Sequence, residues 1–331
     1  MADTVSVSVA LCTFNGSRFI REQIRSILAQ SVLPDEIVVS DDASVDDTID
    51  VIVDEHARWS REAETPVRLH IHRNDVSLGV TANFASAMLR CSGDLIALSD
   101  QDDVWHPDRL ERVIAEFDGR PDVLLVHSDA RIVDGTGVPD GTGLFSTLGL
   151  SAAERRAVAE GRPFAALMRR NFVTGATTMI RRELVERARP FPASWVHDEW
   201  LAVVAAATGS LVLLDEQLID YRQHGGNQIG ASSLTPAGRL ARLTTPRTER
   251  NTRLRVRAGE LQTRMPRLSP RPSDDDIALA AAKAEHELVR DCLPGRRLRR
   301  IAPVWREWRT GRYRSCGLGL QDVLRDLVQP E

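Results

Sequence analysis

The sequence predicts an α/β protein with a mostly parallel central sheet, and three observations lead to this prediction. Short apolar runs rich in β-branched residues alternate with amphipathic segments over the first hundred residues. This order of strand, helix and strand is typical of right-handed βαβ units, whose strands lie parallel in one sheet. Polar residues directly follow several of the apolar runs. Ligands bind outside the carboxyl ends of the strands in such sheets, so these polar residues are the first candidates for a site.

The N-terminal part of the chain supplies the clearest pattern. Four strands are predicted, each a short apolar run, at residues 5–11, 36–40, 67–72 and 95–98. Three helices are predicted between them, at residues 18–30, from Asp46 or Asp47 onward, and at 80–90.

The middle of the chain continues with shorter elements. Helices are predicted at residues 108–118, 164–170 and 182–187, and a longer one that starts near Asp198 and ends near residue 207. Strands are predicted at residues 123–126, 177–180 and 211–214. Residues 134–149 and 221–227 are predicted loops, because the first is rich in glycine and the second is polar.

The character of the chain changes near Ser232. Arginines crowd the stretch from Arg239 to Arg257, and Ser273 followed by three aspartates predicts the start of a helix over residues 277–292. A second basic stretch precedes Trp305 and Trp308. We therefore expect a helical, arginine-rich C-terminal appendage.

Composition places the chain among ordinary soluble globular proteins. It has 331 residues, of which 42% are hydrophobic and 27% charged, and the net charge of -4 gives no sign of nucleic-acid binding. The spacing of its four cysteines matches no zinc site or redox pair. We find no signal peptide and no apolar stretch of the ~18 residues that span a bilayer. These features predict a cytoplasmic protein, and peripheral contact with the membrane stays open.

The strand at residues 95–98 ends in Asp100-Gln101-Asp102-Asp103. Carboxylates this close repel one another unless a cation or solvent relieves them. Oxygen ligands suit Mg²⁺ or Mn²⁺, and such an ion commonly completes its shell with substrate phosphates. The sequence therefore predicts a metal-bridged diphosphate site, with a solvated turn or a helix cap at Asp103 as the alternative.

Two further polar clusters follow predicted strands, at Thr13–Asn15 and at Asp41-Asp42. We expect both clusters to converge with the acidic cluster on one edge of the sheet. Of the two neighbouring aspartates, Asp41 is the better candidate for a structural role.

Two other classes of function lack residues that they need, and a third stays open. A phospho-acceptor domain needs a lysine at a later strand end, and the only lysine is Lys283. A sugar nucleotidyltransferase usually carries a glycine-rich basic loop after the first strand, where this chain has only Gly16 and Arg18. A nucleotide-sugar-binding protein without transfer activity stays open.

Five sequence motifs, taken in their order along the chain, together resemble one family. The first four are Val9–Gly16, Val38–Ser44 followed by Asp46-Asp47-Thr48, Asp100-Gln101-Asp102, and His197–Trp200; the fifth is Tyr221–Asn227. In this order they resemble the inverting glycosyltransferases of family 2, and most of all the bacterial rhamnosyltransferase-like branch. The resemblance runs from about residue 5 to residue 230.

The resemblance implies a GT-A fold and a division of the chain. Residues 1–230 would form the glycosyltransferase domain, with residues 1–128 as the nucleotide-binding half and residues 129–230 as the acceptor half. Residues 231–331 would form the helical C-terminal region. The implied partners are a nucleoside-diphosphate sugar donor and a glycan or lipid-linked acceptor, with Mg²⁺ or Mn²⁺ as the cofactor.

The resemblance also implies roles for single residues. Thr13, Phe14 and Asn15 would flank the donor base, Asp42 would accept a hydrogen bond from the pyrimidine, and Asp100 would lie near the ribose. Gln101 would also belong to the donor-binding residues. Asp102 would ligate the metal, with His224 as a second ligand or a contact to the diphosphate. Asp198 would deprotonate the acceptor hydroxyl.

Each implied role has an ordinary alternative. Asp198 also suits the first turn of a helix, where the macrodipole favours carboxylates, and Glu199 is a competing base. His224 also suits a solvated loop. Asn83 is expected to be a surface or capping residue. The C-terminal arginines suit a solvated helix face or peripheral contact with an anionic membrane.

Overall fold

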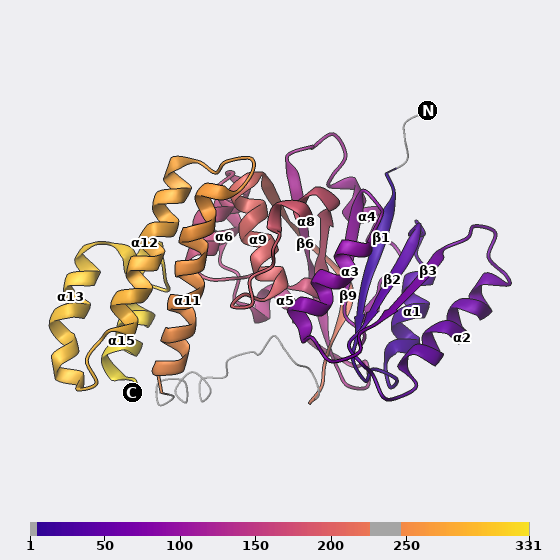
Figure 1. The fold of residues 1–331 in the computed structure, drawn as a ribbon, viewed down its shortest axis with the longest axis horizontal. Coiled ribbons are helices and arrows are strands. Elements are labelled where there is room, and N and C mark those ends of the chain that lie inside the picture. Colours follow the sequence, from indigo (N-terminus) through magenta and orange to yellow (C-terminus); the bar gives the residue numbers. More distant parts are fainter. Residues whose placement is uncertain (1–4, 226–245, 331) are drawn as a thin grey trace. The chain divides into compact units, whose positions relative to one another are not determined.

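The computed structural model describes residues 5–225 and 246–330. These residues fall into two compact units (Figure 1). Among the described residues, the first unit comprises 5–151, 173–205 and 209–225, and the second comprises 152–172, 206–208 and 246–330. The boundary at 230 and 231 expected from the sequence lies outside the described residues, as do Gly226, Asn227, Arg239 and Arg242.

The first unit is built on one mixed sheet. Its strands lie in the order β3-β2-β1-β4-β8-β6-β9-β5, and β7 pairs with β6. The strands are β1 (Val7–Thr13), β2 (Glu36–Asp41), β3 (Arg68–Arg73), β4 (Leu95–Ser99), β5 (Val104–Trp105), β6 (Val123–Asp134), β7 (Pro139–Gly143), β8 (Thr178–Arg181) and β9 (Ser210–Gln223). The four N-terminal strands are parallel, as predicted, whereas β8 is antiparallel to β4 and to β6.

Helices cover both faces of the N-terminal strands. The helices of this unit are α1 (Ile20–Leu28), α2 (Thr48–Ser60), α3 (Val80–Arg90), α4 (Arg109–Ala115), α5 (Leu144–Thr147), α8 (Arg182–Ala188) and α9 (His197–Thr208), with a 3₁₀ turn η1 (Gly175–Thr177). Apolar side chains of α1 and α2 pack in one cluster with the alternate residues Val7, Val9 and Leu11 of β1. Helix α3 packs against β1 and β2 through residues outside that cluster, so it covers the opposite face.

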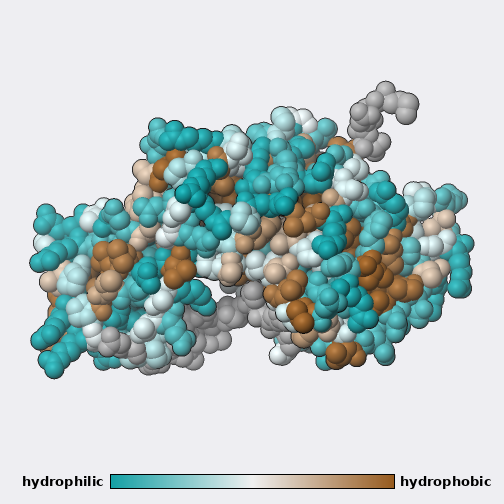
Figure 2. Space-filling view, in the orientation of Figure 1, coloured by the Kyte–Doolittle hydropathy of each residue, from teal (hydrophilic) through white to brown (hydrophobic). Residues whose placement is uncertain are grey.

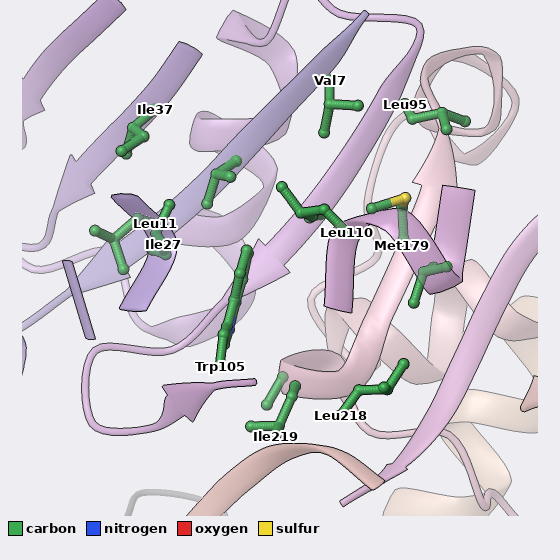
Figure 3. Packing of buried hydrophobic residues seen from close by; sticks show 14 of the residues in the cluster. Val7, Leu11, Ile27, Ile37, Leu95, Trp105, Leu110, Met179, Leu218 and Ile219 are labelled. Atoms are coloured by element: carbon green, nitrogen blue, oxygen red, sulfur yellow. The ribbon is translucent and has the colours of Figure 1, made fainter. Parts of the chain in front are cut away.

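The core extends to the far strands through the short strand β5. Trp105 of β5 is 3% exposed and lies opposite Ile219 of β9. Figure 3 shows its ring among the core side chains, with Leu218 and Ile219 on one side of it. This pairing fixes the end of β9 next to the residues that follow β4.

Two predicted loops contain regular structure, and the helix Ala152–Ala159 and strand β5 fall on residues for which no element was predicted. The predicted loop at 134–149 contains β7 and α5, because β7 pairs along β6 as an edge strand. The predicted polar loop that begins at Tyr221 is instead the end of β9 as far as Gln223, where Tyr221, Arg222 and Gln223 pair with β6. Polar residues at a strand edge give no apolar run to recognise.

The second unit is helical. Its elements are α6 (Ala152–Ala159), α7 (Pro163–Arg169), α11 (Thr248–Arg264), η2 (Met265–Arg267), α12 (Asp274–Asp291), η3 (Arg297–Arg300), α13 (Ile301–Arg309), α14 (Arg312–Ser315) and α15 (Leu320–Val328). Ser273 caps α12 as predicted, since its Oγ accepts a hydrogen bond from the Asp276 amide at 3.1 Å. No helix in the described parts of either unit is long and apolar enough to cross a membrane.

Candidate active site

The carboxyl ends of β1, β2 and β4 lie next to one another. In the parallel register Thr13 lies opposite Asp41, and Leu11 lies opposite Ser99. The polar residues that follow these strands therefore meet at one edge of the sheet, which is where an open α/β sheet places its ligands.

The turn after β1 is held by Gln101. The Phe14 amide donates to Gln101 Oε1 at 2.8 Å, and Gln101 Nε2 donates to the Phe14 carbonyl at 3.1 Å. A Cβ atom at Gly16 would lie 2.2 Å from Gln101 Oε1, so a glycine there allows this close approach. The Phe14 ring is 37% exposed. The turn thus presents an aromatic face, and Gln101 fixes its backbone.

Thr13 and Asn15 use their side chains to join the first turn to the second. Thr13 Oγ1 donates to Asp41 at 2.8 Å, and Asn15 Oδ1 accepts from the Val45 amide at 2.9 Å. Asp41 also accepts from the Ser44 amide at 3.0 Å and is fully buried. Asp41 therefore has a structural role in this turn.

The carboxylate of Asp42 already makes four hydrogen bonds. It accepts from the amides of Leu78 and Gly79, from Ser77 Oγ and from Asn74 Nδ2, at 2.7 to 3.0 Å. Burial opposes ionisation, but these hydrogen bonds outweigh it and lower the pKa of Asp42. Asp42 therefore anchors the loop before α3, and contact with a donor base would require one of these bonds to open.

Asn83 belongs to the same anchored region. It is 3% exposed, its Nδ2 donates to the Ser40 carbonyl at 2.9 Å, and its Oδ1 accepts from Asn74 at 3.1 Å. The expectation of a surface or capping residue is wrong, because the side chain satisfies buried backbone at the end of β2.

The acidic cluster after β4 is buried with little compensation. Asp102 is 8% exposed and Asp103 is 2% exposed. Burial, followed by the charges of Asp102 and Asp198, raises the pKa of Asp100 to about 7. Asp103 does not cap α4, whose N-cap residue is Asp108; it accepts from the Arg222 amide at 2.9 Å.

The end of β9 brings a second set of residues to this cluster. His224 Nε2 lies 2.9 Å from Asp102 Oδ2, and its ring stacks on Phe19 with a centroid distance of 4.6 Å. Arg222 Nε donates to the Asp102 carbonyl at 2.8 Å. The predicted pair of Asp102 and His224 is therefore in direct contact, although 122 positions separate the two residues.

Asp198 lies in the first turn of α9 with both carboxylate oxygens oriented. Its Oδ2 accepts from the Gly175 amide at 2.8 Å, and its Oδ1 accepts from the Glu199 amide at 2.7 Å. A Cβ atom at Gly175 would lie 2.9 Å from His197 Nε2, so this position suits glycine. The charge of Asp198 contributes to the raised pKa of Asp100.

Sequence reasoning gave no role to Tyr221 and Arg222. Tyr221 is 5% exposed; burial raises its pKa, and the charges of Asp103, Asp100, Asp102 and Asp198 raise it further, in that order. The signal was present in the fifth motif, but only the pairing of β9 shows which residues it faces.

The donor set fits a divalent ion in part. The described residues contain no group of three or more His, Cys, Asp or Glu side chains arranged to hold a metal. Asp102 offers carboxylate oxygen and His224 offers imidazole nitrogen, a pair that suits Mn²⁺. Burial raises the pKa of Asp102, although the hydrogen bond and the charge of His224 oppose this shift, so a bound cation would favour the ionised carboxylate. Two protein ligands with the rest from a diphosphate is a common arrangement for such ions.

Comparisons with known proteins bear on the family and the fold of the chain. The sequence model described as glycosyl transferase family 2 matches residues 8–188. An uncharacterized glycosyltransferase of Nostoc sp. is 29% identical over 239 residues, which cover 70% of this chain and 69% of that protein. The chain spans 59% of an uncharacterized Mycobacterium bovis protein that it matches.

Two solved structures share the fold. Residues 1–349 of Staphylococcus aureus TarS in complex with UDP-GlcNAc match with a TM-score of 0.56 at 17% identity, over 91% of this chain and 80% of that one. Against the longer TarS chain the match spans 43% of its length. A Pyrobaculum calidifontis mannosyltransferase in complex with GDP-Man and Mn²⁺ matches with a TM-score of 0.55 at 18% identity, over 98% of this chain and 79% of that one.

Proposed function

Because the chain belongs to glycosyl transferase family 2, we propose that it transfers a sugar from a nucleoside-diphosphate donor to a hydroxyl group with inversion of configuration. The acceptor we propose is a cell-surface glycan or a lipid-linked precursor. Rhamnose is the first donor sugar to test, because the motifs resemble those of rhamnosyltransferases. The observation that carries the proposal is that the site holds two different groups. Asp198 is a carboxylate held in one orientation, and the Asp102–His224 pair lies at the acidic cluster whose member Asp100 is influenced by the charge of Asp198.

Asp198 is proposed as the base. An inverting transfer needs one carboxylate within hydrogen-bond reach of the acceptor hydroxyl, opposite the leaving group. The Gly175 amide donates to Asp198 Oδ2 and the Glu199 amide donates to Asp198 Oδ1. These bonds also hold the carboxylate in one orientation, which favours proton transfer over a fixed path. A covalent nucleophile is not required.

Asp102 and His224 are proposed to hold a divalent ion, Mg²⁺ or Mn²⁺. When bound, such an ion neutralises charge that develops on the departing diphosphate. Asp102 and His224 would exchange their direct contact of 2.9 Å for contacts to the ion. Support for the ion comes from the donor types and from the neighbouring carboxyl groups of Asp100 and Asp103, whose pKa values are raised by burial.

The turn after β1 is proposed to receive the nucleotide base. The exposed ring of Phe14 offers a stacking face, and Thr13, Asn15 and Gln101 fix the backbone that carries it. Asp100 and Asp42 are proposed to lie near the ribose and the pyrimidine.

A pair of substitutions tests these roles. We expect Asp198→Asn and Asp102→Ala each to lower transfer by about a thousandfold or more, measured with a panel of dTDP-, UDP- and GDP-sugars and Mn²⁺. Only Asp102→Ala should also weaken Mn²⁺-dependent binding of the nucleoside diphosphate, followed by thermal shift. Asp118→Asn, an exposed acid outside the site, is the matched control.

Three outcomes would contradict the proposal. Full turnover by Asp198→Asn would remove the base assignment. Equal nucleotide binding with and without Mn²⁺ would remove the metal. Donor binding without transfer or hydrolysis of any sugar in the panel would favour a binding protein.

A further inference from the structure

In the C-terminal segment of the second unit, the acidic side chains are buried and many of the arginines are exposed. Between residues 292 and 330 there are three acidic residues, Glu307, Asp322 and Asp326, and all three are buried. Each has a cationic partner in the interior: Arg312 for Glu307, Arg325 for Asp322 and Arg290 for Asp326. The outer surface of this segment therefore carries no acidic residue among the described positions.

Arginines occupy that outer surface. Six are exposed: Arg296, Arg297, Arg299, Arg306, Arg309 and Arg314. Within the described residues none of the six forms an ion pair with a carboxylate, and two lie over indole rings, Arg309 over Trp305 and Arg314 over Trp308, both at 4.9 Å. The surface is therefore strongly basic on a protein whose net charge is -4.

Apolar side chains are exposed among these arginines. Leu320, Leu324 and Val328 are 67%, 56% and 44% exposed and form one stripe of α15 at four-residue spacing. On the neighbouring segment Leu298 is 84% exposed, and Ile301 and Trp305 of α13 are 56% and 57% exposed. Single exposed leucines are common, but two stripes on helices that pack together need an explanation. Figure 2 shows apolar residues among hydrophilic ones on the visible face of this unit.

Buried contacts hold these helices rigidly. Arg300 is fully buried, and its guanidinium donates to the Asp326 carbonyl at 3.1 Å and to the Gln329 carbonyl at 2.6 Å. Tyr313 donates to Asp326 at 2.8 Å, inside a small core formed with Leu293 and Val304. The exposed apolar stripes therefore lie on helices that buried contacts hold in place, and not on frayed helix ends.

We propose that η3, α13 and α15 form a surface that binds the interface of an anionic lipid bilayer. Helices that lie on membranes combine exposed apolar and Trp side chains with arginines that contact anionic headgroups. A second copy of the chain docked on the same face by twofold symmetry would set these arginines against themselves with no carboxylate between them. A nucleic acid would leave the aliphatic stripes unused.

Vesicle binding by the full chain tests this surface. We expect cosedimentation with phosphatidylcholine vesicles that contain phosphatidylglycerol, and none with phosphatidylcholine alone, at an ionic strength of about 0.1 M. Each arginine near such a surface strengthens binding roughly fivefold, so Arg297→Gln with Arg299→Gln should weaken binding at least about tenfold. Leu320→Gln with Leu324→Gln should weaken it by a similar factor through lost insertion.

Matched pairs in the first unit control for charge and for exposed apolar area. Arg61→Gln with Arg182→Gln removes two other exposed arginines, and Val53→Gln with Leu89→Gln alters two other exposed apolar residues. Both control pairs should bind vesicles as the unmodified protein does. Circular dichroism and nucleotide binding confirm that the variants remain folded.

Several results would overturn the proposal. These are no binding to anionic vesicles at low salt, or binding that survives the Arg297 and Arg299 substitutions. Equally tight binding of single-stranded DNA that is indifferent to the leucine pair would assign the surface to another polyanion. Self-association that the same substitutions abolish would assign it to a contact between copies.

Discussion

The acidic cluster of Asp100, Asp102 and Asp103 and the charge network of α12 and α15 both contain buried carboxylates, but the pKa values of the two groups shift in opposite directions. In the network, Arg290 is 1% exposed and contacts Asp326 at 2.8 Å, Glu287 at 3.3 Å and Asp322 at 3.5 Å. Lys283 contacts Glu287 at 2.8 Å. The pKa values of Glu287 and Asp322 are lowered, because nearby cations outweigh the effect of burial.

The acidic cluster shows the opposite behaviour. There burial dominates, and the pKa values of Asp100, Asp102 and Asp103 are all raised. Buried carboxylates that contact cations stabilise one arrangement of helices. Buried carboxylates that lie close together repel one another, and a bound cationic ligand can relieve this repulsion. The comparison therefore separates charges that hold the fold from charges that serve the site.

The largest expected effect is at the centre of the charge network of α12 and α15. Arg290→Met would leave Glu287, Asp322 and Asp326 without their shared cation, and we expect a loss of about 3–5 kcal/mol in the free energy of unfolding. Denaturant titration measures the change. Arg297→Met, at an exposed arginine, is the control and should change stability by less than about 0.5 kcal/mol. A small effect of Arg290→Met would mean that the network is not what orders α12 and α15.

A second substitution tests an acid of the site that is fully hydrogen-bonded. Asp42→Ala would leave the amides of Leu78 and Gly79 without their acceptor, at a cost of about 1–3 kcal/mol. Hydrogen exchange should show faster exchange of these two amides. Asp75→Ala, in the same loop, is the control. If the amides kept their protection, Asp42 would be available for the nucleotide base, and the loop would not depend on it.

A third substitution should have the opposite sign. Asp100→Asn removes one charge from the acidic cluster, and we expect the ligand-free protein to gain about 1–2 kcal/mol of stability while transfer is lost. Asp326→Asn, in the charge network of α12 and α15, should lose stability under the same conditions. Thermal unfolding with and without Mn²⁺ measures both. A loss of stability in Asp100→Asn would show that the acidic cluster is internally compensated.

The smallest expected effect is a pH dependence in the second unit. Burial lowers the pKa of His286, although the hydrogen bond to Glu307 at 2.7 Å opposes this shift. A histidine with a lowered folded-state pKa contributes stability above its unfolded pKa of about 6.5, and the contribution is lost as the pH falls below that value. His286→Gln should flatten the stability profile from about pH 6.5 downward, by roughly 1 kcal/mol or less. His70→Gln, at an exposed histidine, should leave the profile unchanged.

Much of the first unit could be predicted from local pattern. In residues 5–99, short apolar runs alternate with segments of helical apolar spacing. This pattern predicts the bounds of β1 to β4 and of α1 to α3 to within two or three residues, because each element is recognisable from its own apolar spacing. The three polar clusters after β1, β2 and β4 were also placed correctly, since the ends of parallel strands must meet. Helix α9 begins at His197 and ends at Thr208, close to its predicted bounds.

The roles of single residues could be predicted from the sequence less well than the elements that carry them. Asp41 and Asp42 look alike in sequence, yet only the loop that carries Ser77 and Leu78 explains why Asp42 accepts four hydrogen bonds. Asn83 looked like a surface residue because helical spacing alone does not reveal that the Ser40 carbonyl needs a donor. The roles of Tyr221 and Arg222 depend on which carboxylates they face.

By itself, the sequence determined the order of strands and helices and the acidic end of β4, because these follow from spacing within about ten residues. Only the tertiary structure decided which distant residues share that site. The pairing of β5 with β9 brings His224 to Asp102, and the turn at Gly175 orients Asp198. Such contacts depend on backbone hydrogen bonds between segments far apart in the chain, and no local pattern encodes their register.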